Sequence, residues 1–421
     1  MNSNSTICLL NDSFPPLIDG VANAVTNYAE QITAQGGRAI VAAPAHPQAN
    51  DDNYSYPVIR YPSVDLRKKT GYMAGIPFSP EIARRISEEN IALLHSHCPI
   101  VSTLLARELR QLTDAPLVLT YHTKFDIDIA NAVPGKALQH GSIRALLENI
   151  NACDEVWTVS KGAGENLRSL GYEGDYFIMP NGVDLPRGRV SEEAVNAAAG
   201  KYDLPDDVPV YLYVGRMMWY KGIRIILDAL AKCSHDFRMV FIGDGTDRQE
   251  IEAYAQSCGI SSKCVFTGSI HERESLRAWY CRSDLFLFPS TFDTNGLVVR
   301  EAAACFLPSV LIRGSAASEG VTDGRSGFLI DENADSLAAC LATLHHQRQK
   351  VKDVGLTAGR ELYLSWETAV SIAMERYQIV IDKYRCGEYA YHRKPMDKLL
   401  HANGKLMEGL GFLQKYREQN Q

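Results

Sequence analysis

The sequence Asp284-Leu-Phe-Leu-Phe-Pro-Ser-Thr-Phe-Asp-Thr-Asn-Gly-Leu-Val-Val-Arg-Glu-Ala302 has the pattern of a buried strand, a loop and the start of a helix. The apolar run Leu285–Phe288 predicts the strand. Asn295–Gly296 is a turn signal, and helical character follows it. Asp293 therefore lies in the loop and Glu301 in the first turns of the helix. The unpaired N–H groups of such a helix start bind a phosphate or another anion.

Length and composition predict a globular protein of two domains. The chain has 421 residues, of which 46% are hydrophobic and 22% charged, so it exceeds one ordinary core and is not disordered. Its net charge of -7 gives no basic excess, and we expect no nucleic-acid partner. The ten cysteines form no Cys-x-x-Cys and no zinc-like spacing, which indicates buried thiols in a reducing compartment.

The start of the chain is polar. Met1–Thr6 lacks the order of a signal peptide, and no apolar run approaches the ~20 residues of a membrane span. We therefore expect a cytoplasmic protein, at most peripheral on the inner face of a membrane.

Strands and helices alternate along the chain. A strand at Thr6–Leu10, an amphipathic helix and a strand at Ala39–Ala43 form a βαβ unit, which implies a parallel sheet. The pattern restarts at Val210–Val214. The predicted fold class is α/β, with two doubly wound parallel sheets.

The turn-rich segment after residue 180 places the domain boundary near residues 185–205. We predict an N-terminal domain over residues 1–190 and a second domain over residues 205–365. C-terminal helices over residues 366–421 should cross back to the first domain.

Polar and glycine residues follow several predicted strands, where open α/β sheets bind ligands. Gly20 suits either close approach of a ligand to the backbone or only a tight turn. Arg216 and Lys221 share one loop, where they neutralise a diphosphate or form a solvated surface. His122 ends an apolar run and is equally consistent with a structural histidine.

Asp293 and Glu301 suit the binding of sugar hydroxyls, because a carboxylate accepts two hydrogen bonds from a vicinal diol. Three other motifs carry little weight. Asp126–Asp128 is a single Asp-x-Asp, and the His95/His97 pair lacks a third zinc ligand. Gly243–Gly245 is a partial dinucleotide motif that lacks its last glycine, so no nicotinamide cofactor is expected.

Residues 64–78 mix basic and apolar side chains in a glycine-rich loop. Arg67–Lys69 are basic, and we expect four apolar side chains to be exposed: Tyr72, Met73, Ile76 and Phe78. Such a loop suits an acceptor, an anionic membrane surface or only solvent. Residues 124–140 suggest a flap, and residues 387–421 form an extension that docks on the protein or on lipid.

Taken in order, these motifs resemble the retaining glycosyltransferases of family 4, which have the GT-B fold of two facing Rossmann-like domains. The resemblance runs from Ile7 to Tyr384. It rests on six motifs: Pro15–Gly20, Thr120–Thr123, Pro180–Asp184, Gly215–Gly222, Gly243–Gly245 and Asp293–Glu301.

The resemblance implies roles for single residues. Arg216 and Lys221 match the cations that hold the donor diphosphate, and Gly20 matches a loop beside the phosphates. His122 matches a histidine near the donor sugar. Such enzymes need no metal and no cofactor, since the nucleotide sugar is a substrate.

The acidic motif matches as well. Glu301 corresponds to the glutamate that binds the nucleotide ribose, and Asp293 to a glutamate that faces the donor sugar. The segment between them contacts sugar and phosphate in the family, here through Asn295, Gly296, Leu297 and Val298. Position 293 departs from the family pattern by one methylene, and Phe306 stands where the family has glycine, which affects helix packing.

The resemblance predicts transfer of a hexose from a nucleotide sugar, in particular a UDP-sugar, to an acceptor hydroxyl with retention. Three N-terminal segments are most similar to bacterial diacylglycerol glucosyltransferases: Pro15–Gly20, His95–Pro99 and Thr120–Thr123. The acceptor is then a membrane lipid, and a soluble sugar or metabolite is the second candidate. Two further functions are compatible with the motifs. One is a nucleotide-sugar epimerase, which needs no acceptor, and the second is a non-catalytic nucleotide-sugar-binding subunit.

Overall fold

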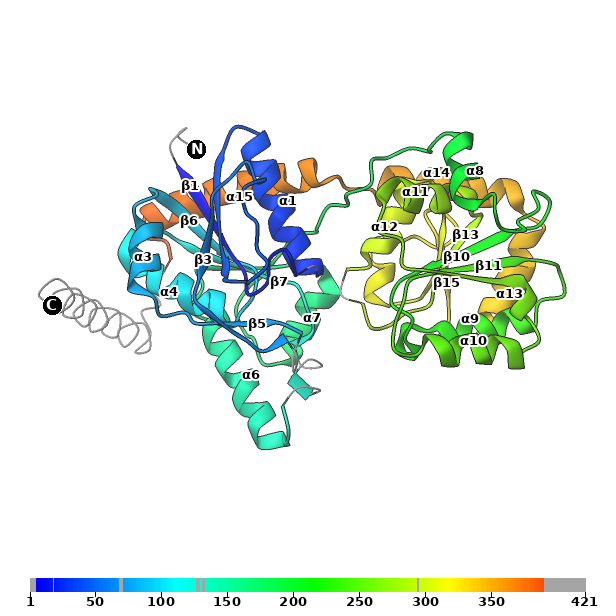
Figure 1. Ribbon diagram of the computed structural model, residues 1–421, viewed down its shortest axis with the longest axis horizontal. Helices are drawn as coiled ribbons and strands as arrows, with labels where there is room; N and C mark the ends of the chain where they lie inside the picture. The colour runs from blue at the N-terminus through cyan, green and yellow to red at the C-terminus, as the bar shows by residue number, and fades with distance from the viewer. Residues whose placement is uncertain are drawn as a thin grey trace, which may run out of the picture. The chain divides into compact units, whose positions relative to one another are not determined.

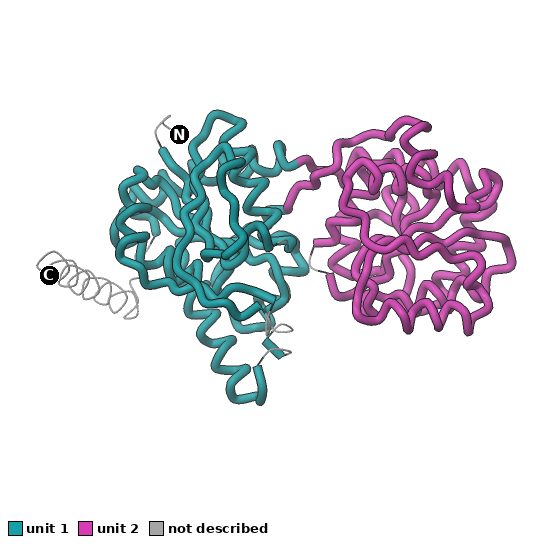
Figure 2. The backbone as a smooth tube through the Cα atoms, in the orientation of Figure 1, with its two compact units in different colours: residues 1–180, 366–421 teal, residues 181–365 magenta. Residues whose placement is uncertain are grey.

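The computed structural model describes residues 5–17, 19–67, 71–125, 129–130, 133–293 and 295–389. The chain divides into two compact units (Figure 2). Unit 1 comprises Met1–Pro180 and Trp366–Gln421, and unit 2 comprises Asn181–Ser365. The chain therefore passes between the units twice.

Unit 1 contains a seven-stranded parallel sheet of order β3-β2-β1-β6-β7-β8-β9 and a two-stranded antiparallel sheet of β4 and β5. Its strands are β1 (Thr6–Leu10), β2 (Arg38–Pro44), β3 (Val58–Tyr61), β4 (Ser63–Asp65), β5 (Met73–Gly75), β6 (Ile91–Ser96), β7 (Leu117–Tyr121), β8 (Glu155–Thr158) and β9 (Phe177–Ile178). Its helices are α1 (Gly20–Ala34), α3 (Pro80–Ser87), α4 (Val101–Thr113), α6 (Lys136–Ile150), α7 (Lys161–Ser169) and α15 (Trp366–Arg385).

Helix α15 returns to unit 1 after the chain has built unit 2, and it packs against α1 (Figure 1). The amide of Gln35 donates to the carbonyl of Glu367 at 3.1 Å and accepts from the hydroxyl of Ser371 at 2.9 Å. The rings of Tyr28 and Trp366 meet edge to face at 5.9 Å between centroids. This helix is thus part of the core of unit 1.

Unit 2 contains a six-stranded parallel sheet of order β12-β11-β10-β13-β14-β15. Its strands are β10 (Val210–Val214), β11 (Arg238–Ile242), β12 (Cys264–Gly268), β13 (Leu285–Phe288), β14 (Ser309–Ile312) and β15 (Phe328–Ile330). Its helical segments are α8 (Glu192–Ala199), η1 (Trp219–Lys221), α9 (Ile223–Ala231), α10 (Arg248–Ser257), η2 (Ser261–Lys263), α11 (Arg273–Arg282), α12 (Leu297–Ala304), η3 (Ala316–Ser318), α13 (Ala334–His345) and α14 (Arg348–Glu361).

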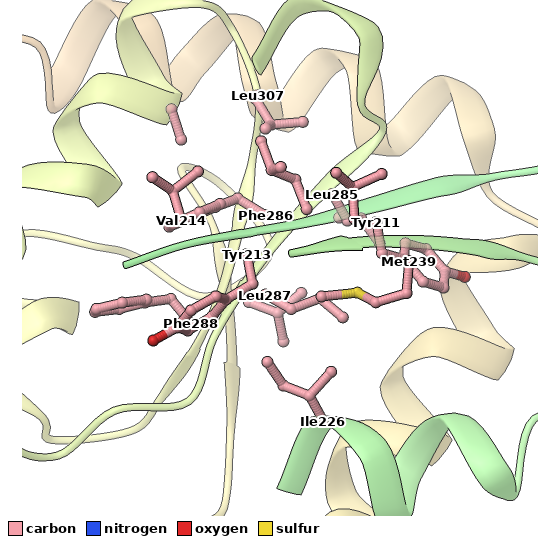
Figure 3. Packing of buried hydrophobic residues seen from close by; sticks show 14 of the residues in the cluster. Tyr211, Tyr213, Val214, Ile226, Met239, Leu285, Phe286, Leu287, Phe288 and Leu307 are labelled. Carbon is pink, nitrogen blue, oxygen red and sulfur yellow. The ribbon is translucent and has the colours of Figure 1, made fainter. Parts of the chain in front are cut away.

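The predicted α/β class with two doubly wound parallel sheets is confirmed. In unit 2, α8, α11, α12 and α14 cover one face of the sheet, and α9, α10 and α13 cover the other (Figure 1). All four residues of β13 are buried, as expected for a parallel strand with helices on both faces. In Figure 3, Leu307 and Ile226 lie on opposite sides of the strands.

The prediction of a plain loop over residues 64–78 is wrong. This stretch contains β5 and most of β4, and Val64 pairs with Ala74 in the hairpin. Met73, which we expected to be exposed, is buried, whereas Tyr72 and Ile76 are 46% and 40% exposed. The basic residues Lys68 and Lys69 lie outside the described residues. A strand of three residues is too short to show an alternating pattern that distinguishes it from a loop in the sequence.

The flap predicted over residues 124–140 is helical from Lys136, where α6 begins. The Asp126–Asp128 motif lies outside the described residues, as does the extension beyond Tyr389.

Phe306 occupies a left-handed backbone conformation, with φ of 61°. Glycine adopts this conformation at least cost, so the family's glycine at this position has a backbone reason. The phenyl ring lies over α14, where a Cβ added to Gly359 would be 2.4 Å from Cδ1 of Phe306. Small residues in α14 thus make room for the bulky one.

Candidate active site

The candidate donor site lies at the carboxyl edge of the unit 2 sheet. Counted along the unit, its strands have the order 3-2-1-4-5-6, and the order reverses between β10 and β13. Open α/β sheets bind ligands at this switch point. Arg216 and Lys221 follow β10, and Asp293 follows β13, so the structure brings the predicted cations and the first carboxylate to one place.

Glycines let the loops at this edge approach one another. A Cβ on Gly243 would lie 1.9 Å from the carbonyl oxygen of Gly215, and one on Gly245 would lie 2.4 Å from that of Met217. The Gly-x-Gly sequence thus serves backbone packing against the Arg216 loop. A Cβ on Gly222 would lie 2.0 Å from the carbonyl oxygen of Pro289, which brings η1 close to the loop after β13.

Lys221 and Asp293 form an ion pair, with Nζ 2.8 Å from Oδ1. The Lys221 side chain is 10% exposed and the Asp293 side chain 21% exposed. The sequence analysis predicted that Lys221 binds the diphosphate and that Asp293 faces the sugar. It did not predict that the two side chains contact each other. Arg216 is exposed and forms no ion pair within the part of the chain that the structure describes.

Several buried polar atoms beside this pair lack partners. Among the described residues, Oδ2 of Asp293 and both amide atoms of Asn295 are buried without a hydrogen-bond partner. Unpaired buried polar atoms are costly, and a polar ligand at this place would supply the missing hydrogen bonds. Gly296, with φ of 56°, precedes Leu297 and Val298 at the start of α12, and no side chain among the described residues caps this helix start. Its free N–H groups favour an anion.

Glu301 lies inside α12 and is buried. Its Oε2 accepts a hydrogen bond from the hydroxyl of Tyr280 at 3.0 Å, and its Oε1 is 3.6 Å from Nη1 of Arg273. Arg273 also forms an ion pair with Asp184. Burial raises the pKa of Glu301, while Arg273 and then Tyr280 act in the opposite direction.

Sequence analysis missed Arg273, Tyr280 and Asp184 as neighbours of Glu301. The first two are seven residues apart on α11, a spacing that puts them on one helix face, but nothing in the sequence says which face meets Glu301. Asp184 belongs to the Pro180–Asp184 motif, but the sequence assigned no role to it.

In unit 1, His122 follows β7 and is 5% exposed. Its Nε2 lies 2.9 Å from Nδ1 of His97. His95 uses both ring nitrogens, with Nε2 2.7 Å from the Thr120 hydroxyl and Nδ1 2.6 Å from the Tyr377 hydroxyl. His95 is therefore a structural residue, and neither of its ring nitrogens is left to bind zinc.

Gly20 begins α1 and is preceded by the cap residue Asp19. Oδ1 of Asp19 accepts from the N–H groups of Val21 and Ala22 at 2.8 and 2.7 Å. A Cβ on Gly20 would meet no described atom within 4 Å, so packing inside unit 1 does not require glycine here. The prediction that a ligand approaches this backbone stays a prediction.

Two family models cover most of the chain. "Glycosyltransferase Family 4" matches residues 18–187, and "Glycosyl transferases group 1" matches residues 196–359. The chain belongs to glycosyltransferase family 4. It is therefore a transferase of a retaining family that moves a sugar from a nucleotide sugar to an acceptor.

Relatives of this chain are named for different activities. A D-inositol 3-phosphate glycosyltransferase of Xylanimonas cellulosilytica is 29% identical over 63% of this chain and 66% of its own length. A sulfoquinovosyl transferase of Arabidopsis thaliana is 25% identical over 86% of this chain and 71% of its own. An alpha-monoglucosyldiacylglycerol synthase of Acholeplasma laidlawii is 25% identical over 83% of this chain and 89% of its own.

Solved structures share the GT-B fold of this family 4 chain. HepE of Anabaena in complex with UDP matches with a TM-score of 0.72 at 17% identity, over 89% of this chain and 100% of that one. The glycosyltransferase WaaG of lipopolysaccharide biosynthesis matches with a TM-score of 0.63 at 16% identity, over 89% and 99%.

Among the described residues, no three or more His, Cys, Asp or Glu side chains are grouped as a metal site. Across the same residues, none of the helices combines the length and the apolar character of a membrane span.

Proposed function

We propose that this family 4 enzyme transfers a hexose from a UDP-sugar to a hydroxyl of a membrane glycerolipid, without a metal ion. The UDP complex of a GT-B neighbour supports the choice of donor base. The relative named as an alpha-monoglucosyldiacylglycerol synthase supports a lipid acceptor. Two features of the chain, one in each unit, carry the proposal.

The observation that carries the donor site is the Lys221–Asp293 pair beside unpaired polar atoms. Exposed Arg216 and the start of α12, which no described side chain caps, are sources of positive potential for a diphosphate. Lys221, whose charge Asp293 balances, adds N–H donors at the same edge of the sheet. The unpaired Oδ2 of Asp293 and the amide of Asn295 suit sugar hydroxyls. Glu301, held by Tyr280, binds the ribose in this proposal.

The proposed reaction uses the leaving group as the base. The cations stabilise the diphosphate as the bond from its oxygen to the anomeric carbon breaks. The acceptor oxygen attacks from the same face, and a phosphate oxygen takes its proton. Asp293 and His122 orient the sugar. Two cations on one loop do the electrostatic work here that a metal ion does in some transferases.

The test of the donor site is the double variant Arg216→Ala/Lys221→Ala. We expect kcat/KM for the donor to fall by at least about 100-fold, the usual scale for removing transition-state electrostatics. The control is Lys232→Ala, which removes a half-exposed cation that pairs with Asp335 elsewhere in unit 2. Unchanged turnover in the double variant would show that these cations do not hold the diphosphate.

The observation that carries the lipid acceptor is the β4–β5 hairpin region of unit 1. Four apolar side chains there are at least 40% exposed: Val64, Leu66, Tyr72 and Ile76. Helix α6 adds exposed Leu138 and the exposed basic residues Lys136, His140 and Arg144 at intervals of four, which share a helix face. Exposed apolar and basic groups of the kind found on these two elements favour an anionic bilayer.

Flotation with vesicles of phosphatidylglycerol and phosphatidylcholine tests this surface. We expect the enzyme to float with anionic vesicles and the variant Tyr72→Ser/Ile76→Ser to float less. Leu356→Ser is the matched control, because it removes a 49% exposed apolar residue from unit 2.

Mass spectrometry of products with diacylglycerol and with inositol phosphates completes the test. Absence of flotation together with transfer to a soluble acceptor would reject the lipid and favour the chemistry of the relative from Xylanimonas. Donor conversion without any acceptor would instead indicate an epimerase.

A further inference from the structure

His97 and His122 form a pair at the carboxyl edge of the unit 1 sheet, and the two ring nitrogens of His97 differ in their hydrogen bonding. Nδ1 of His97 is 2.9 Å from Nε2 of His122, and the two rings are inclined by 26°. The other nitrogen of His97, Nε2, is buried without a hydrogen-bond partner among the described residues. His97 is 1% exposed, so bulk water does not reach it.

Both rings are neutral at neutral pH. Burial lowers the pKa of His122 to about 3 and holds that of His97 well below its ordinary value. A neutral imidazole carries one proton, so one ring donates across the 2.9 Å contact and the other accepts. The direction of this hydrogen bond fixes the tautomer of both rings.

The unpaired nitrogen decides between the two directions. If His97 accepted, its own proton would sit on Nε2 as a buried N–H group without an acceptor. Buried unpaired N–H groups are rarer in proteins than buried unpaired acceptors. If His97 donates from Nδ1, its Nε2 is an unprotonated lone pair, which is the cheaper arrangement.

We propose that His97 is a positioning residue whose Nδ1–H donates to Nε2 of His122 and thereby keeps the proton of His122 on Nδ1. His122 then presents a fixed N–H donor from its other ring nitrogen. This N–H group donates a hydrogen bond to an oxygen of the sugar or of the phosphate. It does not act as the base that takes the proton from the hydroxyl of the acceptor substrate. This role of His122 rests on the proposed function, whereas the tautomer does not.

Packing holds His97 in this orientation. Its ring lies 4.0 Å from that of His95, whose two nitrogens are fixed by Thr120 and by Tyr377 of α15. The ring of Tyr28 on α1 meets His97 at 5.2 Å with an interplanar angle of 66°. Rotation of the His97 ring would require these neighbours to move.

The direct test is two-bond 1H–15N correlation NMR on the full chain labelled with [15N]histidine. We expect His122 to carry its proton on Nδ1, with Nε2 unprotonated. The opposite tautomer in the wild type would overturn the proposal, and this measurement requires neither a variant nor activity.

Activity of His97 variants supplies the second test. His97→Phe keeps a ring but cannot donate, so His122 should become free to protonate on Nε2. We expect kcat to fall on the order of 10- to 100-fold with little change in donor KM. His97→Asn, whose amide N–H replaces Nδ1–H, should retain the Nδ1-protonated tautomer and most of kcat.

The control is His235→Phe, which removes a histidine hydrogen-bonded to Tyr211 at 2.9 Å in unit 2. A loss of kcat in His97→Phe with the His122 tautomer unchanged would overturn the positioning role. If the wild type transfers no sugar, the proposed function fails while the tautomer of His122 is still measured.

Discussion

Replacing Asp293 with Asn removes the negative charge that lies 2.8 Å from Nζ of Lys221. The amide has the same size as the carboxylate, so the change is mainly electrostatic. The Lys221 side chain is 10% exposed, and water can therefore replace only part of the lost partner. We expect the variant to be less stable than the wild type and to respond more strongly to a diphosphate.

The magnitude follows from the distance and the burial. Two unit charges 2.8 Å apart attract by ~6 kcal/mol at an effective dielectric constant of about 20. The amide oxygen still accepts a hydrogen bond, and the pair is partly solvated, so we expect a net loss of about 2 kcal/mol. In a domain the size of unit 2 this loss lowers Tm by ~4–8 °C.

The functional part of the prediction uses UDP as the probe. In the wild type Asp293 already neutralises Lys221, whereas in Asp293→Asn the diphosphate supplies the missing charge. UDP should therefore raise the Tm of the variant by more degrees than that of the wild type. The assay is differential scanning fluorimetry over a UDP series, with uridine as the control ligand because it lacks phosphates.

A UDP shift that is equal or smaller in Asp293→Asn would refute this reasoning, since Lys221 would then not contact the diphosphate. The variant Lys221→Met/Asp293→Asn removes both charges. We expect it to be more stable than Asp293→Asn alone and to lose the additional UDP shift.

Three further predictions concern residues around the site. Burial raises the pKa of Glu301 above its ordinary 4.5. The stability that protonated Glu301 contributes is therefore present below pH 4.5 and is lost as the pH rises through the folded-state pKa. As the pH rises above 4.5, the Tm of Glu301→Gln should increase relative to the Tm of the wild type. In Gly222→Ala, the new Cβ would lie 2.0 Å from the oxygen of Pro289, so the Lys221 loop must shift and calorimetry should show UDP affinity reduced on the order of 10-fold. Gly359→Ala would place a Cβ 2.4 Å from the ring of Phe306 and cost about 2 kcal/mol in denaturant unfolding, and Phe306→Gly in the same chain should restore part of it.

The fold could be predicted because parallel strands buried on both faces leave a strong local signal. Leu285–Phe288 and Val210–Val214 are short apolar runs followed by loop residues, and both are strands with those bounds. The hairpin of β4 and β5 left no such signal. Its strands have three residues each, and the burial of Met73 comes from the fold around it.

The site could be predicted only as far as single loops. Sequence placed Arg216, Lys221 and Asp293 at strand ends, but the contact between Lys221 and Asp293 joins positions 72 residues apart. The order of the strands in the sheet determines which loops lie close together. The alternation of strands and helices along the sequence does not reveal that order. The cluster of Arg273 and Tyr280 with Glu301 was missed for the same reason.

The glycines show how one residue type serves different purposes in similar motifs. Gly243 and Gly245 form a Gly-x-Gly sequence that suggests a nucleotide loop, yet a Cβ on either would strike the backbone of the Arg216 loop. Gly20, in contrast, has open space where its Cβ would be. Sequence alone cannot distinguish a glycine that faces a ligand from one that faces its own chain.

The aspartate at position 293 connects the two ends of the proposed donor site. Its Oδ1 bonds Lys221, which faces the diphosphate in our proposal, and its Oδ2 is left for the sugar. A glutamate carboxylate would extend about 1.5 Å further and could not keep the 2.8 Å contact without movement of Lys221 or of the loop. The shorter side chain therefore holds the phosphate-binding cation and the sugar-facing oxygen on one carboxylate. In our proposal, donor choice at this position depends on the Lys221–Asp293 pair, because a change in either residue alters the 2.8 Å contact between them.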